Sequence, residues 1–266
     1  YKAGKANVDP DTPDLATAMS GPDSHKYREA MCAEIQQLES LNCWDIVAKS
    51  ELPSNANVLP GTWAFKLKRF PDGRPRKYKA RFCARGDLQI EGKDYTDKWA
   101  PVVSWSTVRM MLCLSISQGW KTRQVDFDNA FVQAAIDLPE VYVKCPVGFN
   151  SAEHDESVVL RLNKSLYGLV QAPMLYYNHL KAGLKACGLE PREQDPCMFI
   201  GRGMVALSYV DDVLWFGPDL EEIDKVIQEL KNGGMPLTIE DDDAYAFLGV
   251  DIVPMAKISF EPSNEG

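Results

Sequence analysis

Two adjacent carboxylates between two apolar runs constrain this sequence more than any other feature. Residues 204–210 and 213–217 are rich in strand-forming side chains, and Asp211 and Asp212 stand where the runs meet. Tight hairpin turns favour Asn-Gly or Asp-Gly, so an Asp-Asp pair is a poor choice for the turn alone. Like carboxylates held side by side repel each other, and a divalent cation commonly relieves that repulsion. The pattern predicts a hairpin that carries a metal site; a solvated acidic turn is the alternative.

A third carboxylate stands at the end of another predicted strand. The run that begins at Thr122 starts as a short strand and turns at the cluster of Asp126, Asp128 and Asn129, so Asp126 should lie at the strand end. Three carboxylates can hold two divalent ions about 3.5 to 4 Å apart, where one lowers the pKa of an attacking hydroxyl and the other stabilises a leaving oxygen. Asp126 is therefore expected to join Asp211 and Asp212, although spacing alone does not establish the chemistry.

Residues 62–85 are predicted to form a second hairpin, with its turn at residues 71–73. Alternation places apolar side chains on one face of each strand. The opposite face carries Lys66, Lys68, Lys77, Lys79, Arg81 and Arg85. Nine basic residues against one acidic residue lie between Lys66 and Arg85. This excess predicts a phosphate-facing hairpin; an ordinary solvated hairpin is the alternative.

The formal net charge of −9 is unevenly distributed along the chain. Residues 1–60 carry 5 basic and 9 acidic side chains, residues 61–125 carry 14 and 5, and residues 126–266 carry 10 and 24. Because phosphate binding depends on the local field, a basic region beside an acidic metal pocket suits a polymerase despite the negative total.

Other site classes have little support in the sequence. The seven cysteines form no C-x-x-C pair, which favours reduced thiols in an intracellular protein. No apolar stretch is long enough to span a bilayer, so we expect a soluble protein, and its start at Tyr1 suggests a trimmed piece of a longer one. The three histidines lack zinc-site spacing, and no Walker-type loop is present.

Hydrophobic periodicity and turn residues predict an α+β fold. Expected helices span residues 24–41 with Ser24 as cap, a segment from Ser104 or Ser106 to Gln118 with Val108, Met111, Leu112 and Ile116 facing a core, 165–186 with an interruption near Pro173, and 220–231. Further strands are expected at 141–143, 158–162, 197–200, 237–239 and 246–253.

Four ordered motifs carry a family resemblance: QVDFDNAF at 124–131, LNKSLYGLVQAP at 162–173, YVDD at 209–212 and FLGV at 247–250. Their order and approximate spacing resemble reverse transcriptases of copia-type LTR retrotransposons. Blocks at 13–22, 44–47, 78–81, 84–86 and 99–102 agree, so the similarity covers about residues 10–253.

The resemblance implies a right-hand polymerase fold with fingers and palm, in which helices back an antiparallel palm sheet. It implies an N-terminal segment and helix at 1–60, fingers with the basic hairpin at 61–120, and a palm at 121–253, with the 164–188 region bordering the fingers. Residues 254–266 would begin a truncated thumb or tail. The family continues into a thumb, a connection and a ribonuclease H domain, so we expect weak primer–template holding from this piece.

The resemblance also implies roles for individual residues. Asp126, Asp211 and Asp212 would be catalytic, and together with the carbonyl of Phe127 they would bind two Mg²⁺ ions, with Mn²⁺ as an alternative. Candidates for nucleotide and template contacts are Lys66, Lys68, Lys79, Arg85, Phe131, Tyr167, Gly168 and Gln171. Phe131 would block a 2′-hydroxyl; an ordinary core phenylalanine is the alternative. Residues 247–249 would form a primer-gripping turn. Residues 174–178 lack the basic residue and Trp often found there.

The implied function is RNA-directed DNA polymerase, adding dNTPs to a primer 3′-hydroxyl. The alternatives are a domesticated, non-catalytic RNA-binding or structural subunit and another two-metal palm polymerase. Expected partners are an RNA or DNA template with primer, dNTP, and a ribonuclease H or thumb segment from the same polyprotein or another chain, with no membrane. The expected location is a cytoplasmic virus-like particle, with the nucleus as a second location.

Overall fold

The computed structural model describes residues 9–136, 140–146, 157–239, 246–247 and 250–251. The chain divides into two compact units, and each unit combines two segments. Unit 1 contains residues 1–100 and 129–180, and unit 2 contains residues 101–128 and 181–266. The predicted fingers and palm are each one continuous range, whereas each unit combines two separate segments. The units therefore do not test the fingers and palm assignment, which stays a prediction. The mixed α and β content confirms the α+β class.

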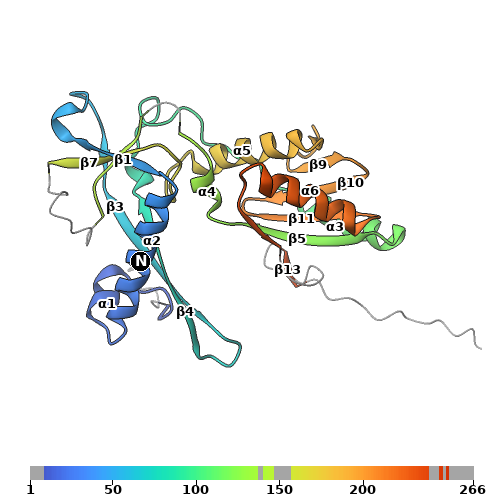
Figure 1. The fold of residues 1–266 in the computed structure, drawn as a ribbon, viewed down its shortest axis with the longest axis horizontal. Helices are drawn as coiled ribbons and strands as arrows, with labels where there is room; N and C mark the ends of the chain where they lie inside the picture. The colour runs from blue at the N-terminus through green and yellow to red at the C-terminus, as the bar shows by residue number, and fades with distance from the viewer. Residues whose placement is uncertain (1–8, 137–139, 147–156, 240–245, 248–249, 252–266) are drawn as a thin grey trace, which may run out of the picture. The chain divides into compact units, whose positions relative to one another are not determined.

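Unit 1 contains a long hairpin, a four-stranded sheet and most of the helices in the described part of the chain (Figure 1). Its elements are α1 (Leu15–Ser20), α2 (Ser24–Ser40), β1 (Trp44–Ala48), η1 (Lys49–Glu51), β2 (Val58–Leu59), β3 (Gly61–Arg69), β4 (Pro75–Ala84), η2 (Gly86–Leu88), α4 (Ala130–Gln133), β6 (Tyr142–Val143), β7 (Val158–Leu162) and the first part of α5 (Ala172–Ala186). Strands β3 and β4 pair only with each other among the described strands, and the sheet has the order β1-β7-β6-β2.

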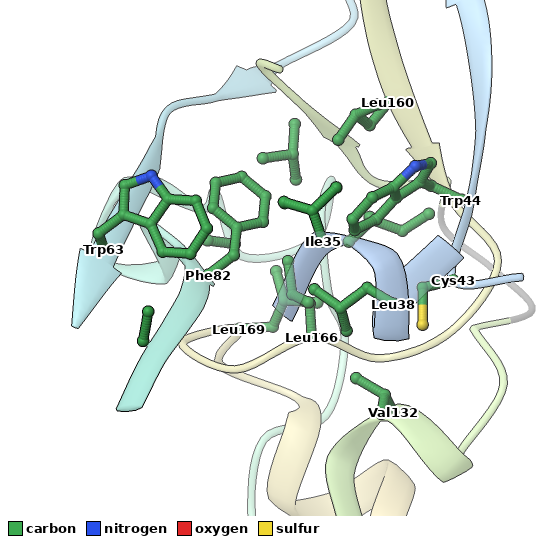
Figure 2. Close-up of a cluster of buried hydrophobic side chains, with 14 of the residues drawn as sticks. Ile35, Leu38, Cys43, Trp44, Trp63, Phe82, Val132, Leu160, Leu166 and Leu169 are labelled. Atoms are coloured by element: carbon green, nitrogen blue, oxygen red, sulfur yellow. The ribbon is translucent and has the colours of Figure 1, made fainter. Parts of the chain in front are cut away.

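The core of unit 1 forms around α2. Tyr27, Met31, Ile35 and Leu38 follow the three- and four-residue spacing of a helix face, and all four are buried. Figure 2 shows Ile35 and Leu38 among aromatic and aliphatic side chains from several elements, including Trp44, Phe82 and Leu166. The apolar face of the β3–β4 hairpin contributes to this core, so the hairpin is anchored on one side.

Unit 2 is built on a six-stranded antiparallel sheet of order β12-β5-β11-β10-β9-β8. Its elements are α3 (Trp105–Gln118), β5 (Lys121–Phe127), β8 (Glu190–Pro191), β9 (Met198–Gly201), β10 (Met204–Tyr209), β11 (Asp212–Gly217), α6 (Leu220–Asn232), β12 (Leu237–Ile239), β13 (Ala246–Phe247) and β14 (Val250–Asp251). Helix α6 packs on β5 and β11 through a stripe of buried residues, Ile223, Val226, Ile227 and Leu230. The sheet therefore brings the ends of the adjacent strands β5 and β11 together.

Three helix predictions need correction. Ser24 is the first residue of α2, and the N-cap position is Asp23, which makes no side-chain capping bond. The helix expected from residue 165 begins at Ala172, because Gly168 has a φ of 88°, in the left-handed region, and Pro173 suits a first helical turn. Ile116 is 82% exposed, although it was expected to face the core.

Other helix predictions are confirmed. Ser104 caps α3, and its hydroxyl accepts a hydrogen bond from the Thr107 amide. Val108 and Met111 face the core, and Thr107 and Ser115 complete the buried stripe. Helix α6 matches its predicted range to within one residue.

No helix in the described part of the chain is long and apolar enough to cross a membrane.

All seven cysteines are free thiols. Burial raises the pKa of Cys43, Cys83 and Cys197 to about 11. A thiol with such a pKa is protonated at neutral pH and is a poor nucleophile. Cys43 and Cys197 therefore act as small core side chains, and Cys83 is a half-buried, unreactive thiol.

Candidate active site

The acidic hairpin, β10–β11, closes through a two-residue turn. Tyr209 pairs with Asp212 across the hairpin, which leaves Val210 and Asp211 as the turn. On its other side β11 pairs with β5, and Asp212 lies opposite Asp126. The fold thus brings Asp126 next to the hairpin end that carries Asp211 and Asp212, as the sequence predicted, but the two turn residues are Val210 and Asp211 and not the expected Asp-Asp pair.

The hydrogen bonds of this ladder specify how the two aspartates face each other. The Phe127 amide donates to the Asp211 carbonyl oxygen at 2.9 Å, one step beyond the pair of Asp126 and Asp212. This pattern makes Asp126 and Asp212 a non-hydrogen-bonded pair, the type whose Cα atoms and side chains are closest. Their carboxylates therefore leave the same face of the sheet from adjacent strands.

The turn carries backbone strain. Val210 has a φ of 53°, whereas Asp211 is not among the residues of positive φ. These signs match a type II′ turn, whose first central position is normally Gly. A β-branched residue in this region costs about 1 to 3 kcal/mol. The turn sequence is therefore not the one that folding alone would select.

The donor atoms suit a hard divalent cation. Asp126, Asp211 and Asp212 are half-buried, and Phe127, whose carbonyl is the predicted fourth ligand, is buried. Carboxylate and carbonyl oxygens are the ligands that Mg²⁺ prefers. Within the described residues, however, no three Asp, Glu, His or Cys side chains converge closely enough to hold an ion. The backbone register and the donor chemistry fit a cation, while the side chains are not gathered around one.

Three polar contacts join β5 and the residue that follows it to neighbouring segments. Arg123 forms a bidentate ion pair with Asp224 of α6, with N–O distances of 2.9 and 3.1 Å. Past the strand end, the Asp128 amide donates to the Pro236 carbonyl at 3.0 Å, and the Thr238 hydroxyl donates to the Asp128 carboxylate at 3.1 Å. Asp126 therefore lies on a strand that is tied to its neighbours on both sides of the residue.

The cationic hairpin, β3–β4, places like charges opposite each other. Lys66 pairs with Lys79, and Lys68 pairs with Lys77. Burial alternates along β3 as predicted, with apolar side chains buried and lysines exposed. Opposed like charges destabilise a strand pair, so this face is organised for something other than hairpin stability.

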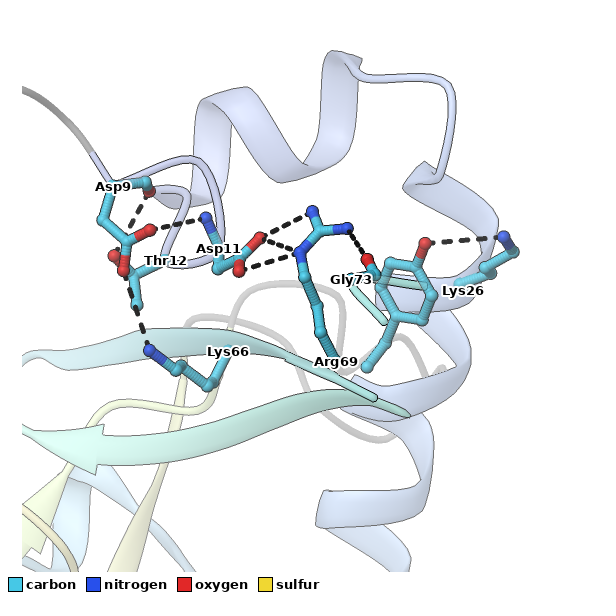
Figure 3. Close-up of polar contacts among 8 residues, drawn as sticks. Asp9, Asp11, Thr12, Lys26, Lys66, Arg69 and Gly73 are labelled. Atoms are coloured by element: carbon cyan, nitrogen blue, oxygen red, sulfur yellow. Dashed lines mark hydrogen bonds and ion pairs between the residues drawn. The ribbon is translucent and has the colours of Figure 1, made fainter. Parts of the chain in front are cut away.

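An acidic segment near the start of the described chain covers part of this hairpin (Figure 3). Asp11 accepts a bidentate ion pair from Arg69 at 2.7 to 2.9 Å, and its carbonyl accepts from the Leu67 amide at 2.7 Å. Asp9 lies 3.6 Å from the Lys66 ammonium. The Arg69 guanidinium holds the pKa of the Asp11 carboxyl below its usual value. One predicted phosphate ligand, Lys66, thus already has a carboxylate nearby.

The remaining basic residues differ in their partners. Arg85 forms an ion pair with Asp87 at 2.6 Å. Lys68 and Lys77 are exposed, and within the described residues neither has a carboxylate within 4.0 Å. Lys68 and Lys77 are therefore the lysines of this face most available to an anion.

An aromatic group in unit 1 contains two of the predicted site residues. The rings of Phe131 and Tyr167 meet edge to face at 5.3 Å, and Phe131 also meets Tyr176 at 6.2 Å. The Arg81 guanidinium lies 4.8 Å from the centre of the Tyr167 ring. The sequence placed Arg81 on the phosphate-facing side of the hairpin, two residues after Lys79, but did not include it among the individual nucleotide or template contacts. We add Arg81 to the candidates.

Gly168 and Gln171 make structural contacts. A Cβ atom at Gly168 would lie 2.2 Å from the Ala84 carbonyl oxygen, and the Ala84 amide donates to the Tyr167 carbonyl at 2.8 Å. Gln171 is 7% exposed and is hydrogen-bonded at both ends of its amide. The roles of both residues at a nucleotide stay predictions. Of the predicted primer-gripping turn, residues 248–249 lie outside the described part of the chain.

Two comparisons relate the chain to known proteins. Residues 41–260 match the family described as "Reverse transcriptase (RNA-dependent DNA polymerase)". The Retrovirus-related Pol polyprotein from transposon RE2 of Arabidopsis thaliana is 32% identical over 239 residues, which are 88% of this chain and 16% of that polyprotein. The corresponding polyprotein from transposon TNT 1-94 of Nicotiana tabacum is 33% identical over 221 residues, 81% of this chain and 16% of its own length.

A yeast protein is similar to the same degree. The Truncated transposon Ty1-A Gag-Pol polyprotein of Saccharomyces cerevisiae is 32% identical over 215 residues, which are 79% of this chain and 17% of that protein. The chain thus spans about a sixth of the length of these relatives. The matches confirm the family resemblance predicted from the four motifs.

Proposed function

The chain belongs to the reverse transcriptase (RNA-dependent DNA polymerase) family, and from this membership we propose that it extends a primer 3′-hydroxyl with dNTPs copied from an RNA template. Enzymes of this kind are nucleotidyltransferases. The observation that carries the proposal is the cross-strand pair of Asp126 and Asp212 beside the strained turn at Asp211. A turn residue that folding disfavours, next to three carboxylates, is best explained by chemistry at those carboxylates.

In the proposed site, two Mg²⁺ ions, or Mn²⁺ in their place, would be held by Asp126, Asp211, Asp212 and the Phe127 carbonyl oxygen. When bound, they would supply the charge that lowers the pKa of the primer hydroxyl and stabilises the departing pyrophosphate. This chain would supply the opposed carboxylates of Asp126 and Asp212 from adjacent strands and the carboxylate of Asp211 from the turn.

The residues of unit 1 have binding roles in the proposal. Lys68 and Lys77 bind phosphates of the template strand, and Lys66, Lys79, Arg81 and Arg85 supply further positive charge for the template and the dNTP triphosphate. The Phe131 ring, held edge to face by Tyr167, excludes a 2′-hydroxyl and so favours dNTPs over rNTPs.

The proposed setting is that of the relatives, which are Pol polyproteins of transposons. We propose that a ribonuclease H or thumb segment from the same polyprotein or another chain completes the enzyme, and that it works in cytoplasmic particles. A second candidate function, a non-catalytic RNA-binding subunit, is favoured by one observation: the exposed like-charged face of the cationic hairpin does not depend on the aspartates.

Primer extension on an RNA template with dNTPs and Mg²⁺ tests the proposal. The unaltered chain is compared with Asp211→Asn/Asp212→Asn and with a control of equal charge change, Glu39→Gln/Glu51→Gln, whose positions are exposed in unit 1. We expect the aspartate variant to lose at least about 1,000-fold in rate, or about 4 kcal/mol, and the control to keep its activity. Salt-sensitive RNA binding by all three proteins, without extension by any, would favour the non-catalytic subunit.

A further inference from the structure

Three side-chain hydrogen bonds join residues far apart in the sequence of unit 1. The Val170 amide donates to Gln89 Oε1 at 2.8 Å. Gln89 Nε2 then donates to Gln171 Oε1 at 2.9 Å, and Gln171 Nε2 donates to the Asp94 carbonyl oxygen at 3.2 Å. All three distances lie in the normal range for N–H···O bonds.

The two ends of this chain of bonds fix the direction of both amides. The Val170 amide can only donate, and the Asp94 carbonyl can only accept. Gln89 must therefore present its oxygen to Val170 and its nitrogen to Gln171. Gln171 must in turn present its oxygen to Gln89 and its nitrogen to Asp94. A flipped amide at either position would place two donors or two acceptors together.

The acceptor end of this chain of bonds is itself held in place. Asp94 is 5% exposed, and its carboxylate accepts from the Ile90 amide at 2.7 Å and from the Asn57 side chain at 2.6 Å. At the other side of the same turn, the Tyr167 carbonyl accepts from Ala84 at 2.8 Å. The turn at residues 167–171 is thus fixed at one end to the last residue of β4 and at the other to the segment that follows the cationic hairpin.

We infer that Gln89 is a positioning residue for nucleotide binding, acting through Gln171 and the main chain of Val170. The inference rests on the proposed function, together with the predicted contacts of Tyr167, Gly168 and Gln171 with the incoming dNTP. Because Gln89 fixes the orientation of the Gln171 amide, the amide hydrogen and the oxygen lone pair that Gln171 does not use in these bonds point in set directions. The turn is therefore ordered before the nucleotide binds.

A double-mutant cycle tests this inference. Gln89→Ala, Gln171→Ala and the double variant are compared by steady-state primer extension, with the dNTP KM and kcat measured separately. We expect Gln89→Ala to raise KM about tenfold with kcat changed less than about twofold. If Gln89 acts through Gln171, Gln89→Ala should have little further effect once Gln171 is Ala. Independent, additive effects would overturn the inference.

The isosteric variant Gln89→Glu separates positioning from general destabilisation. Its carboxylate can still accept from Val170 but cannot donate to Gln171, so we expect KM to rise while the Val170 amide stays protected in hydrogen exchange. Gln89→Ala should lose both. The control for charge is Gln36→Glu, at an exposed position on α2. An unchanged KM in Gln89→Glu, or an equal rise in Gln36→Glu, would overturn the inference.

The unaltered chain provides the reference that separates the two proposals. If it extends the primer and the variants behave like it, the inference fails and the proposed function stands. If it extends no primer and binds no dNTP, the proposed function fails, and the inferred role of Gln89 fails with it.

Discussion

The acidic hairpin β10–β11 and the cationic hairpin β3–β4 are both antiparallel pairs, but they support their charges differently. The acidic hairpin lies inside a six-stranded sheet, and its strands are buried almost throughout. The cationic hairpin is a two-stranded pair with one buried face and one exposed face. The first arrangement fixes a few carboxylates closely, as bond-making chemistry requires. The second spreads charge over a surface, which suits binding to a polymer of phosphates.

The strongest way to test this contrast is at the base and the tip of the cationic hairpin. Gly168 and Gly73 both have positive φ, of 88° and 84°. Gly168 contacts the base of the hairpin, where an added Cβ atom would lie 2.2 Å from the Ala84 carbonyl oxygen. At Gly73, in the tip, an added Cβ atom would have no neighbour within 4 Å. We expect Gly168→Ala to lower the unfolding free energy by about 3 kcal/mol or more and Gly73→Ala by about 1 kcal/mol, measured by urea denaturation. Equal losses would mean that the base is not a rigid anchor.

The next largest effect is expected on the exposed face of the same hairpin. Lys68→Gln/Lys77→Gln should weaken RNA binding about tenfold and lower the slope of log K against log salt by about 1.4, because two phosphate contacts are lost. Fluorescence anisotropy at several salt concentrations measures both quantities. The control Lys121→Gln/Lys231→Gln changes the net charge equally at exposed positions of unit 2. An equal loss in that control would assign binding to total charge.

A smaller effect is expected at the acidic turn. Val210→Gly should raise the unfolding free energy by up to about 1 kcal/mol, because relief of the strained φ exceeds the entropy cost of Gly. Val205→Gly, at a buried position of β10, should instead destabilise by several times that amount. A loss of stability in Val210→Gly would show that the valine side chain supports the turn.

The smallest effect is expected where α2 meets the edge of the cationic hairpin. The Glu34 carboxylate accepts from the Phe82 amide at 3.3 Å, and burial raises its pKa, opposed by that hydrogen bond and by Arg81 and Lys79. Because the pKa of Glu34 is raised in the folded state, folding favours its protonated form. The contribution of Glu34 to the unfolding free energy is therefore complete below about pH 4.5 and is lost as the pH rises through the folded pKa.

Glu34→Gln should therefore melt slightly higher than the unaltered chain at pH 7, and the two should converge as pH falls below 4.5. Thermal melts from pH 4 to pH 8 measure the difference. A lower melting temperature for Glu34→Gln at pH 7 would mean that Arg81 and Lys79 hold the carboxylate ionised and outweigh its burial.

Local patterns predicted most of the elements that carry these charges. Period-two alternation identified both faces of β3 and β4, and the paired apolar runs located β10 and β11 around the aspartates. Motif order then grouped Asp126 with Asp211 and Asp212, whereas the cross-strand register of Asp126 with Asp212 came only from the structure. The error at Ile116 shows the limit of periodicity, because an apolar residue at helical spacing does not reveal how wide the buried stripe is.

Contacts between distant segments were beyond prediction from the sequence. The bonds between Gln89 and residues 170–171 join positions more than eighty apart, and neither glutamine belongs to a hydrophobic pattern. The Arg81 stack on Tyr167 likewise depends on how two segments meet. Such residues become visible only when burial and donor direction are known.

The opposed lysines of the cationic hairpin give dissolved ions two opposite effects. Lys66 faces Lys79 and Lys68 faces Lys77, so each pair repels in the free protein. Added salt screens that repulsion and strengthens the hairpin, yet the same salt weakens its hold on phosphates. The ionic strength at which this protein is most stable should therefore be higher than the ionic strength at which it binds RNA most tightly. Bound RNA should itself act as a counter-ion that reduces the repulsion between the lysines.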